Sequence, residues 1–270
     1  MKISRIIELL EGIAPQSLQE NYDNCGLITG NIDWEIKNIL VTLDTTEDVV
    51  DEAIKRGCNF IIAHHPIVFF GLKKINGNNY VERVIIKAIK NDIAIFAIHT
   101  NLDKVNNGVN AKILEKIGCI NNSPLQALEK KLSTGGTSNG MVGFLQKPEF
   151  VIDFLLRIKD IFNCGSIKYT STFDDKEIKK IAVCGGAGSF LIKDAIKCNA
   201  DIFITSDITY HQFFDSENKI VIADIGHYES EQFTKELLFD FLHNFFPEIT
   251  IETGINFIIS QTKTNPVNYI

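Results

Sequence analysis

Short apolar runs alternate with amphipathic segments along this chain, and most of the runs end in polar residues. Apolar runs bounded by turn formers are typical of buried strands, whereas apolar residues spaced three and four apart indicate helices. We therefore expect strands within Ile36–Asp44, Asn59–Ala63, Ile93–Ile98, Met141–Gln146, Ile181–Cys184, Asp201–Thr205 and Lys219–Asp224. Helices are expected at Ser4–Ile13, Thr46–Gly57, Tyr80–Asn91, Asn107–Gly118, Glu149–Phe162 and Gly226–Phe246. This order predicts an α/β fold with mixed, largely parallel sheets.

Residues 119–140 interrupt the alternation, because turn formers accumulate there. The segment predicts a linker or flexible loop between a first α/β lobe, residues 1–118, and a second, residues 141–270. A weak internal repeat supports two related lobes. A shift of 142 residues places Phe60–Ile62 on Ile202–Ile204 and His65 on Asp207. We therefore expect two similar lobes that present their strand ends to a shared cleft, to which the last helix also contributes.

Composition and charge exclude several classes of protein. The 270 residues are 45% hydrophobic and 23% charged, as in a globular protein, and the net charge of -7 makes nucleic acid an unfavourable partner. Glu8 and Glu11 interrupt the apolar pattern of the N-terminal segment, so it does not read as a signal peptide. We expect no membrane span and a cytoplasmic location. The six cysteines form no C-x-x-C pair and are expected to be reduced core thiols.

Three segments end in side chains that bind metals. His64 and His65 follow the apolar run Asn59–Ala63, and His99 with Asp103 follows Ile93–Ile98. His227 and Glu231 are four apart, so on a helix they share one face. Mixed imidazole and carboxylate ligands suit two adjacent ions of zinc, iron or manganese, with a carboxylate bridging them.

Each of these features also has a simpler interpretation. Adjacent histidines after a strand can be ordinary loop residues, and Glu229 and Glu231 can serve only the dipole of the helix that they begin. Asp23 could be functional, although a turn-capping role is favoured. Gly185–Ser189 could offer backbone N–H groups to a phosphate or could be a plain tight turn.

The ordered motifs AHHP, HTNLD, CGGAG, S-D-x-x-Y-H and GHYESE resemble the dinuclear metal-centre family of GTP cyclohydrolase I type 2 homologues, also called YbgI-like, over essentially the whole chain. The resemblance implies two divalent ions per chain, bound by His64, His65, Asp103, His227 and Glu231, in a cleft shared by the two lobes. It implies that His99 and His211 line the same pocket. It also implies a ring-shaped homohexamer. Ser206 departs from the family pattern, in which glycine is usual at this position.

Two metal ions can activate a water molecule and polarise a substrate, which is hydrolase chemistry. The resemblance and the ligands together predict a metal-dependent hydrolase of a nucleotide-like or phosphorylated small molecule, with His99 and His211 as acid–base groups. A protein that binds and delivers metal, or regulates through partners without turnover, is the alternative. A DNA-associated role has poor charge support.

Overall fold

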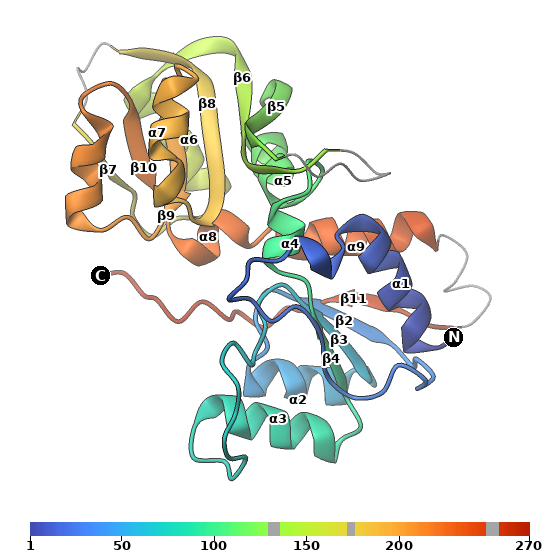
Figure 1. The fold of residues 1–270 in the computed structure, drawn as a ribbon. Helices are drawn as coiled ribbons and strands as arrows, with labels where there is room; N and C mark the ends of the chain where they lie inside the picture. The colour runs from blue at the N-terminus through green and yellow to red at the C-terminus, as the bar shows by residue number, and fades with distance from the viewer. Residues whose placement is uncertain (129–135, 172–175, 247–253) are drawn as a thin grey trace. The chain divides into compact units, whose positions relative to one another are not determined.

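The computed structural model describes residues 1–128, 136–171, 176–246 and 254–270, and these form two compact units, each with its own β-sheet (Figure 1). The first unit contains residues 1–102 and 234–264, and the second contains residues 103–233 and 265–270. The predicted α/β fold with two lobes is therefore confirmed. The chain passes from one unit to the other three times, after residues 102, 233 and 264.

The first unit is built on a five-stranded sheet in the order β1-β4-β3-β2-β11. Its strands are β1 Gly26–Thr29, β2 Ile39–Thr42, β3 Phe60–Ala63, β4 Ala94–Ala97 and β11 Phe257–Ile259. All neighbouring pairs are parallel except β1 and β4. The register pairs Thr42 with Ala63 and Ala63 with Ala97, so β2, β3 and β4 end level with one another. Residues that follow these strands consequently emerge at the same edge of the sheet.

Helices cover both faces of this first sheet (Figure 1). One face carries α2 Glu47–Lys55 and α3 Tyr80–Lys90, and the other carries α1 Ile3–Ile13 and α9 Thr234–Phe245. The sequence starts α2 and α3 with capping side chains, because Thr46 accepts a hydrogen bond from Val49 N and Asn79 accepts one from Glu82 N. Short elements η1 Gln16–Leu18 and α4 Thr100–Asp103 complete the unit, although Asp103 itself belongs to the second unit.

The second unit is built on a six-stranded sheet in the order β5-β6-β8-β9-β10-β7. Its strands are β5 Ile120–Ala127, β6 Ser138–Phe150, β7 Lys168–Tyr169, β8 Glu177–Ala187, β9 Ile202–Ser206 and β10 Val221–Asp224. The central strands β8, β9 and β10 are parallel, and the outer pairings are antiparallel. The helical elements are α5 Val109–Ile117, α6 Val151–Ile161, η2 Ser189–Leu191, α7 Ile192–Lys197, η3 Tyr210–Ser216 and α8 His227–Glu231.

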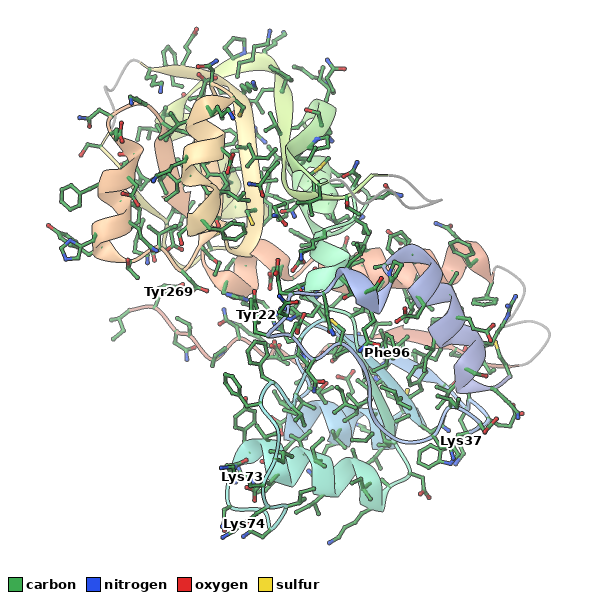
Figure 2. All side chains as sticks on the ribbon, in the orientation of Figure 1. Tyr22, Lys37, Lys73, Lys74, Phe96 and Tyr269 are labelled. Atoms are coloured by element: carbon green, nitrogen blue, oxygen red, sulfur yellow. The ribbon has the colours of Figure 1, made fainter. Side chains whose placement is uncertain are left out.

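Apolar side chains fill the interiors of both units. In the first, Leu40, Ile61 and Ile95 of neighbouring strands pack with the helices α2 and α3 in one buried cluster. Phe96 points into the interior, whereas Lys37, Lys73 and Lys74 lie at the surface (Figure 2). All six cysteines are free thiols, and five of them are buried. Within the described residues, no helix combines the length and the apolar character that crossing a membrane requires.

Two segments differ from the sequence predictions. In the described part of residues 119–140, which we expected to be a linker, Ile120–Ala127 forms β5 and Ser138 begins β6. The turn formers are tolerated there because β5 is an edge strand, where Pro124 interrupts no inner ladder. The helix expected from Gly226 to Phe246 is interrupted between α8 and α9, where the side chain of Gln232 hydrogen-bonds to backbone carbonyls of Phe162 and Glu229.

Glu52 on α2 anchors the segment that follows β11. Its carboxylate accepts hydrogen bonds from the Ser260 hydroxyl at 2.7 Å, from the Thr262 hydroxyl at 2.7 Å and from the backbone N–H of Gln261 at 3.1 Å. Burial alone would raise the pKa of Glu52, but the hydroxyls of Ser260 and Thr262 outweigh it and hold this pKa below its usual range.

We predict that Glu52→Ala lowers the free energy of unfolding by about 1.5–3 kcal/mol, the usual size for hydrogen bonds to a charged group. Because the folded pKa is depressed, this contribution is present above the unfolded pKa of about 4.3 and is lost as the pH falls through the folded value. Urea unfolding at several pH values measures it. Asp51→Ala, which breaks a pair of Asp51 with Lys87 at 2.7 Å, is the control and should cost under about 1 kcal/mol.

Candidate metal centre

Three histidines converge in the first unit because the strands before them end level with one another. His64 and His65 follow β3, and His99 follows the end of β4. One ring nitrogen from each lies within 4.8 Å of the others, and the ring centroids are 4.9–5.2 Å apart. His64 is buried, while His65 and His99 are half-buried. The structure therefore brings His99 together with the predicted pair.

The same ring nitrogen of each of these imidazoles faces a hydrogen-bond acceptor. His64 Nδ1 lies 2.8 Å from the carbonyl oxygen of Ile98, and His65 Nδ1 lies 2.7 Å from Asp44 Oδ1. His99 Nδ1 lies 2.8 Å from Asp23 Oδ1. A carbonyl or carboxylate oxygen can only accept, so Nδ1 carries the proton in each ring and, in the neutral imidazole, Nε2 has the lone pair that a metal ligand needs.

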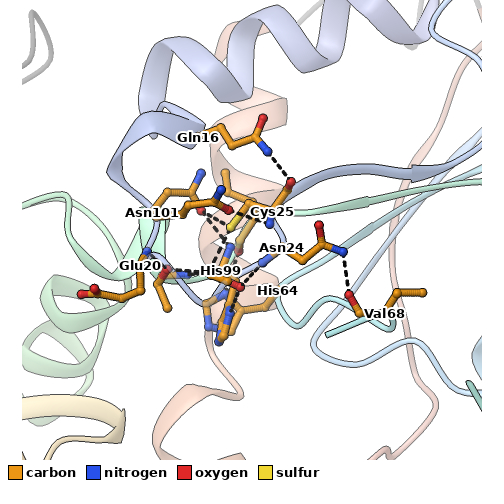
Figure 3. A network of polar contacts seen from close by, with 12 residues as sticks. Gln16, Glu20, Asn24, Cys25, His64, Val68, His99 and Asn101 are labelled. Carbon is orange, nitrogen blue, oxygen red and sulfur yellow. Dashed lines mark hydrogen bonds and ion pairs between the residues drawn. The ribbon is translucent and has the colours of Figure 1, made fainter. Parts of the chain in front are cut away.

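Asp23 is a buried carboxylate that orients His99, which lies in the network of polar contacts shown in Figure 3. In addition to His99 Nδ1, it accepts a hydrogen bond from the Thr100 hydroxyl and one from Thr100 N at 3.1 Å. Burial would raise the pKa of Asp23, but the hydrogen bonds from His99 and Thr100 outweigh it and hold the pKa well below its usual range. Asp23 therefore stays ionised beside the imidazole.

The second unit contributes an imidazole and two carboxylates. His227 and Glu231 lie on one face of α8, as the spacing predicts, with His227 Nε2 3.1 Å from Glu231 Oε2. His227 Nδ1 lies 2.6 Å from Asp207 Oδ2. Burial opposes a charge on His227, yet the Glu231 and Asp207 carboxylates raise its pKa to about 11. A metal ion at Nε2 would have to replace this proton.

Asp103 lies near Glu231 in the second unit. One carboxylate oxygen of Asp103 is within 4.8 Å of one of Glu231, whose side chain is nearly fully buried. Asn110 holds the backbone here, since its Nδ2 donates to the Asp103 carbonyl at 3.0 Å and its Oδ1 accepts from Gly185 N at 2.9 Å. Two carboxylates this close favour a cation.

Gly186 of the CGGAG segment makes room for the side chains of Glu231 and His227. A Cβ atom at Gly186, where φ is +62°, would lie 2.5 Å from Glu231 Oε1 and 3.4 Å from His227 Cε1. The N–H groups of Gly185 and Gly186 donate to Asn110 Oδ1 and Ser230 Oγ. These two N–H groups are thus used within the protein, so Gly185 and Gly186 do not form the phosphate cradle considered from the sequence.

His211 lies on η3 with its ring exposed. Its ring centroid is 5.3 Å from that of Tyr210 and 6.5 Å from that of Phe214. Within the described residues, no group of candidate metal ligands includes His211. It therefore belongs to an aromatic group, and its predicted acid–base role stays a prediction.

Residues 1–266 match the sequence model of Duf34/NIF3 (NGG1p interacting factor 3). The chain belongs to this family. It is 33% identical to a Clostridium acetobutylicum protein named GTP cyclohydrolase 1 type 2 homolog over 270 residues, covering 100% of this chain and 99% of that protein. A protein of the same name from Clostridium perfringens is 34% identical, with both chains fully covered.

Solved structures agree with this assignment. Staphylococcus aureus hypothetical protein SA1388 matches with a TM-score of 0.92 and 31% identity, covering 100% of this chain and 99% of that one. A Bacillus cereus protein related to NIF3 matches with a TM-score of 0.91 and 25% identity, with the same coverage. The resemblance predicted from the motifs is therefore confirmed, and the fold of this Duf34/NIF3 protein is that of its relatives.

The donor atoms of this Duf34/NIF3 chain fit borderline divalent metals. In the described residues, the groups that could hold an ion consist of imidazoles and carboxylates and contain no cysteine. Cys184 lies near Asp103 and Glu231, but its burial raises the pKa of the thiol far above neutrality, so it stays protonated. Nitrogen and oxygen donors of this kind suit zinc, iron or manganese.

Three carboxylates that orient ligands were not predicted for the site: Asp23, Asp44 and Asp207. Asp44 was predicted only as the polar end of a strand and Asp207 only as the counterpart of His65 in the repeat. Asp23 precedes β1, whose antiparallel pairing puts Gly26 opposite Ala97, so the start of β1 lies at the edge where β4 ends. Only this pairing brings Asp23 to His99.

We predict that Gly186→Ala displaces Glu231 and lowers the metal content of the protein, because the new methyl group overlaps Glu231 Oε1. Gly118→Ala is a matched control: its φ is +84°, but nothing lies within 4 Å of an added Cβ. The control should cost only the left-handed backbone strain of about 1–2 kcal/mol and keep its metal. Urea unfolding and elemental analysis measure both effects. Equal metal content in the two variants would contradict this role of Gly186.

Proposed function

We propose that this protein is a dinuclear-metal hydrolase acting on a nucleotide-like or phosphorylated small molecule. The observation that carries the proposal is the common orientation of four histidines. Each of His64, His65, His99 and His227 has Nδ1 held by a carbonyl or carboxylate oxygen, at 2.6–2.8 Å. Orienting partners of this kind are typical of metal-binding imidazoles.

Two divalent ions would be held by His64, His65, Asp103, His227 and Glu231. When bound, such ions lower the pKa of a water molecule and polarise a substrate oxygen. Five ligands exceed the three or four protein ligands of a single tetrahedral ion, and the carboxylates among them can bridge two ions. Glu231 is buried, and another carboxylate and an imidazole lie close to it, so it would be among the residues that hold the ions.

His99 is assigned the transfer of a proton at Nε2. The ionised Asp23 keeps its Nδ1 protonated and stabilises the positive charge that the ring gains when Nε2 takes a proton. Asp23, Thr100 and Asn101 hold the segment around His99 by hydrogen bonds, so the ring need not reorient during the transfer. His211, exposed in the second unit, is assigned the second acid–base role.

The substrate class rests on chemistry and on the relatives. Water activated beside two cations attacks phosphate esters and polarised carbon–nitrogen bonds. The clostridial relatives are named after GTP, a nucleotide. A negatively charged substrate also complements the two ions in a chain whose net charge is otherwise -7.

We predict two metal equivalents per chain in the wild-type protein and metal-dependent turnover of a substrate in a panel of nucleotides and phosphoesters. His64→Ala should lose metal and turnover together. His211→Ala should keep both ions yet lose turnover about 100- to 10,000-fold, the usual cost of removing an acid–base group. Elemental analysis and steady-state kinetics on the same preparations measure both quantities. His243→Ala, which removes an exposed ring stacked on Phe239, is the control and should change neither.

His99→Ala separates the two roles open to that residue. Retention of both ions with loss of turnover supports proton transfer, whereas loss of one equivalent identifies His99 as a ligand. A fully metal-loaded protein that turns over nothing in the panel would favour the alternative, a protein that delivers metal or regulates through partners. A measurement of the metal exchange rate then tests that alternative directly.

The proposal also includes a cytoplasmic homohexamer. It rests on the resemblance to the family. Light scattering should give about six times the chain mass of 30.3 kDa. A monodisperse monomer at micromolar concentration would refute the hexamer without affecting the metal assignment.

A further inference from the structure

The second unit contains a pocket of about 380 Å³, and none of the residues that line it is a candidate metal ligand. Four aromatic side chains line it: Tyr169, Tyr210, Phe213 and Phe214. Its polar wall includes Glu217 and Asn218. A volume of this size is within the range of small-molecule sites, and an aromatic lining with a few polar groups is their usual composition.

The aromatic wall is exposed in a way that a purely structural cluster would avoid. Tyr210 is 73% exposed, Phe214 is 66% exposed and Tyr169 is 46% exposed. The rings of Tyr210 and Phe214 meet edge to face, with centroids 5.5 Å apart and planes at 75°. Rings at this angle present both a face and an edge to a planar ligand.

The wall is also held in place. Thr209 and Gln212 form a capping box at the start of η3, and Gln212 Nε2 donates to Ser189 Oγ at 3.0 Å. At the other end, the backbone of Lys219 donates to the buried Ser216 at 2.8 Å. A wall held at both ends loses little conformational entropy when a ligand binds.

Charge narrows the choice of ligand. Glu217 carries a carboxylate at the pocket and pairs with Lys219 at 2.5 Å, which holds the pKa of Glu217 below its usual range. An ionised carboxylate accepts hydrogen bonds from N–H groups, so Glu217 favours a ligand that carries such donors. Glu217 and Asn218 both have left-handed backbone, with φ of 48° and 56°, and Glu217 is the C-cap that ends η3.

The residues of the pocket wall follow closely in the sequence after a residue that orients a candidate metal ligand. Asp207, which hydrogen-bonds His227 Nδ1, is three residues before Tyr210. The segment after β9 therefore orients a candidate metal ligand and then forms the pocket wall.

We propose that this pocket binds a planar nitrogen heterocycle of nucleobase size, stacked on the face of one of the rings of Tyr210 and Phe214 and in contact with the edge of the other, with an N–H group of the ligand donating to Glu217. The inference rests on the proposed function for its claim that the heterocycle is part of the substrate. Binding of the ring itself requires no turnover.

The test measures binding of adenosine, guanosine and cytidine to the full-length, metal-loaded protein by isothermal calorimetry, with ribose 5-phosphate as a probe that has the phosphate and no ring. We expect at least one nucleoside to bind and ribose 5-phosphate not to compete with it. Phe214→Ala and Tyr210→Ala should each weaken nucleoside binding about 5- to 100-fold, the usual effect of removing a stacking ring. Glu217→Gln should weaken it about 5-fold through loss of a charged acceptor.

Phe190→Ala is the matched control, because Phe190 is 62% exposed in the same unit and does not line the pocket. It should leave nucleoside binding unchanged, and unfolding midpoints should show that all variants are folded. Absence of nucleoside binding to the wild type, or equal weakening by Phe190→Ala, overturns the proposal. A change in oligomer mass for Tyr210→Ala without nucleoside binding would assign the surface to a second copy of the chain instead. Nucleoside binding that persists in His64→Ala, which should lack turnover, separates this proposal from the proposed function.

Discussion

The hydrogen bond at Nδ1 of each candidate metal-binding histidine is the interaction on which the rest of the site depends. An imidazole binds a metal through a lone pair, and the acceptor opposite Nδ1 decides that the lone pair is at Nε2. His65, His99 and His227 each use a carboxylate for this purpose, from Asp44, Asp23 and Asp207. His64 uses the carbonyl of Ile98, at the end of a neighbouring strand. Each of the four rings thus has an acceptor at Nδ1, and His227 also faces Glu231 at Nε2.

Strand register supplies these acceptors in the first unit. Because β2, β3 and β4 are parallel and end level with one another, the residues after them meet at one edge of the sheet. Asp44 follows β2, the His64–His65 pair follows β3, and His99 follows β4. A shift of the register by one residue would turn the side chains to the opposite face. The apolar core that fixes the register therefore also positions the candidate ligands.

The second unit also brings candidate ligands together, but there the geometry of a helix does so instead of strand register. Its imidazole and one carboxylate are one helical turn apart on α8, so local helix geometry brings His227 and Glu231 together. Space for them comes from Gly186, whose positive φ and missing side chain admit Glu231. Asn110 and Ser230 hold the backbone of the neighbouring strand by accepting its N–H groups. The glycine segment thus contributes to the site because Gly186 has no side chain, which leaves space for Glu231.

The sequence by itself determined the features that depend on local periodicity and residue chemistry. Apolar runs indicated the central strands of both sheets, helical spacing placed His227 and Glu231 on one face, and the ordered motifs identified the family. The tertiary structure alone decided which side chains orient the ligands, because Asp23 and His99 are 76 residues apart and meet only through the pairing of β1 with β4. It also showed that the described part of residues 119–140 contains strand. The segment Ile120–Ala127 forms a strand because it pairs with β6, although its composition is that of a loop. The aromatic pocket was not predicted for the same reason: Tyr169 and Tyr210 come from distant segments, and no pattern along the chain records that they line one cavity.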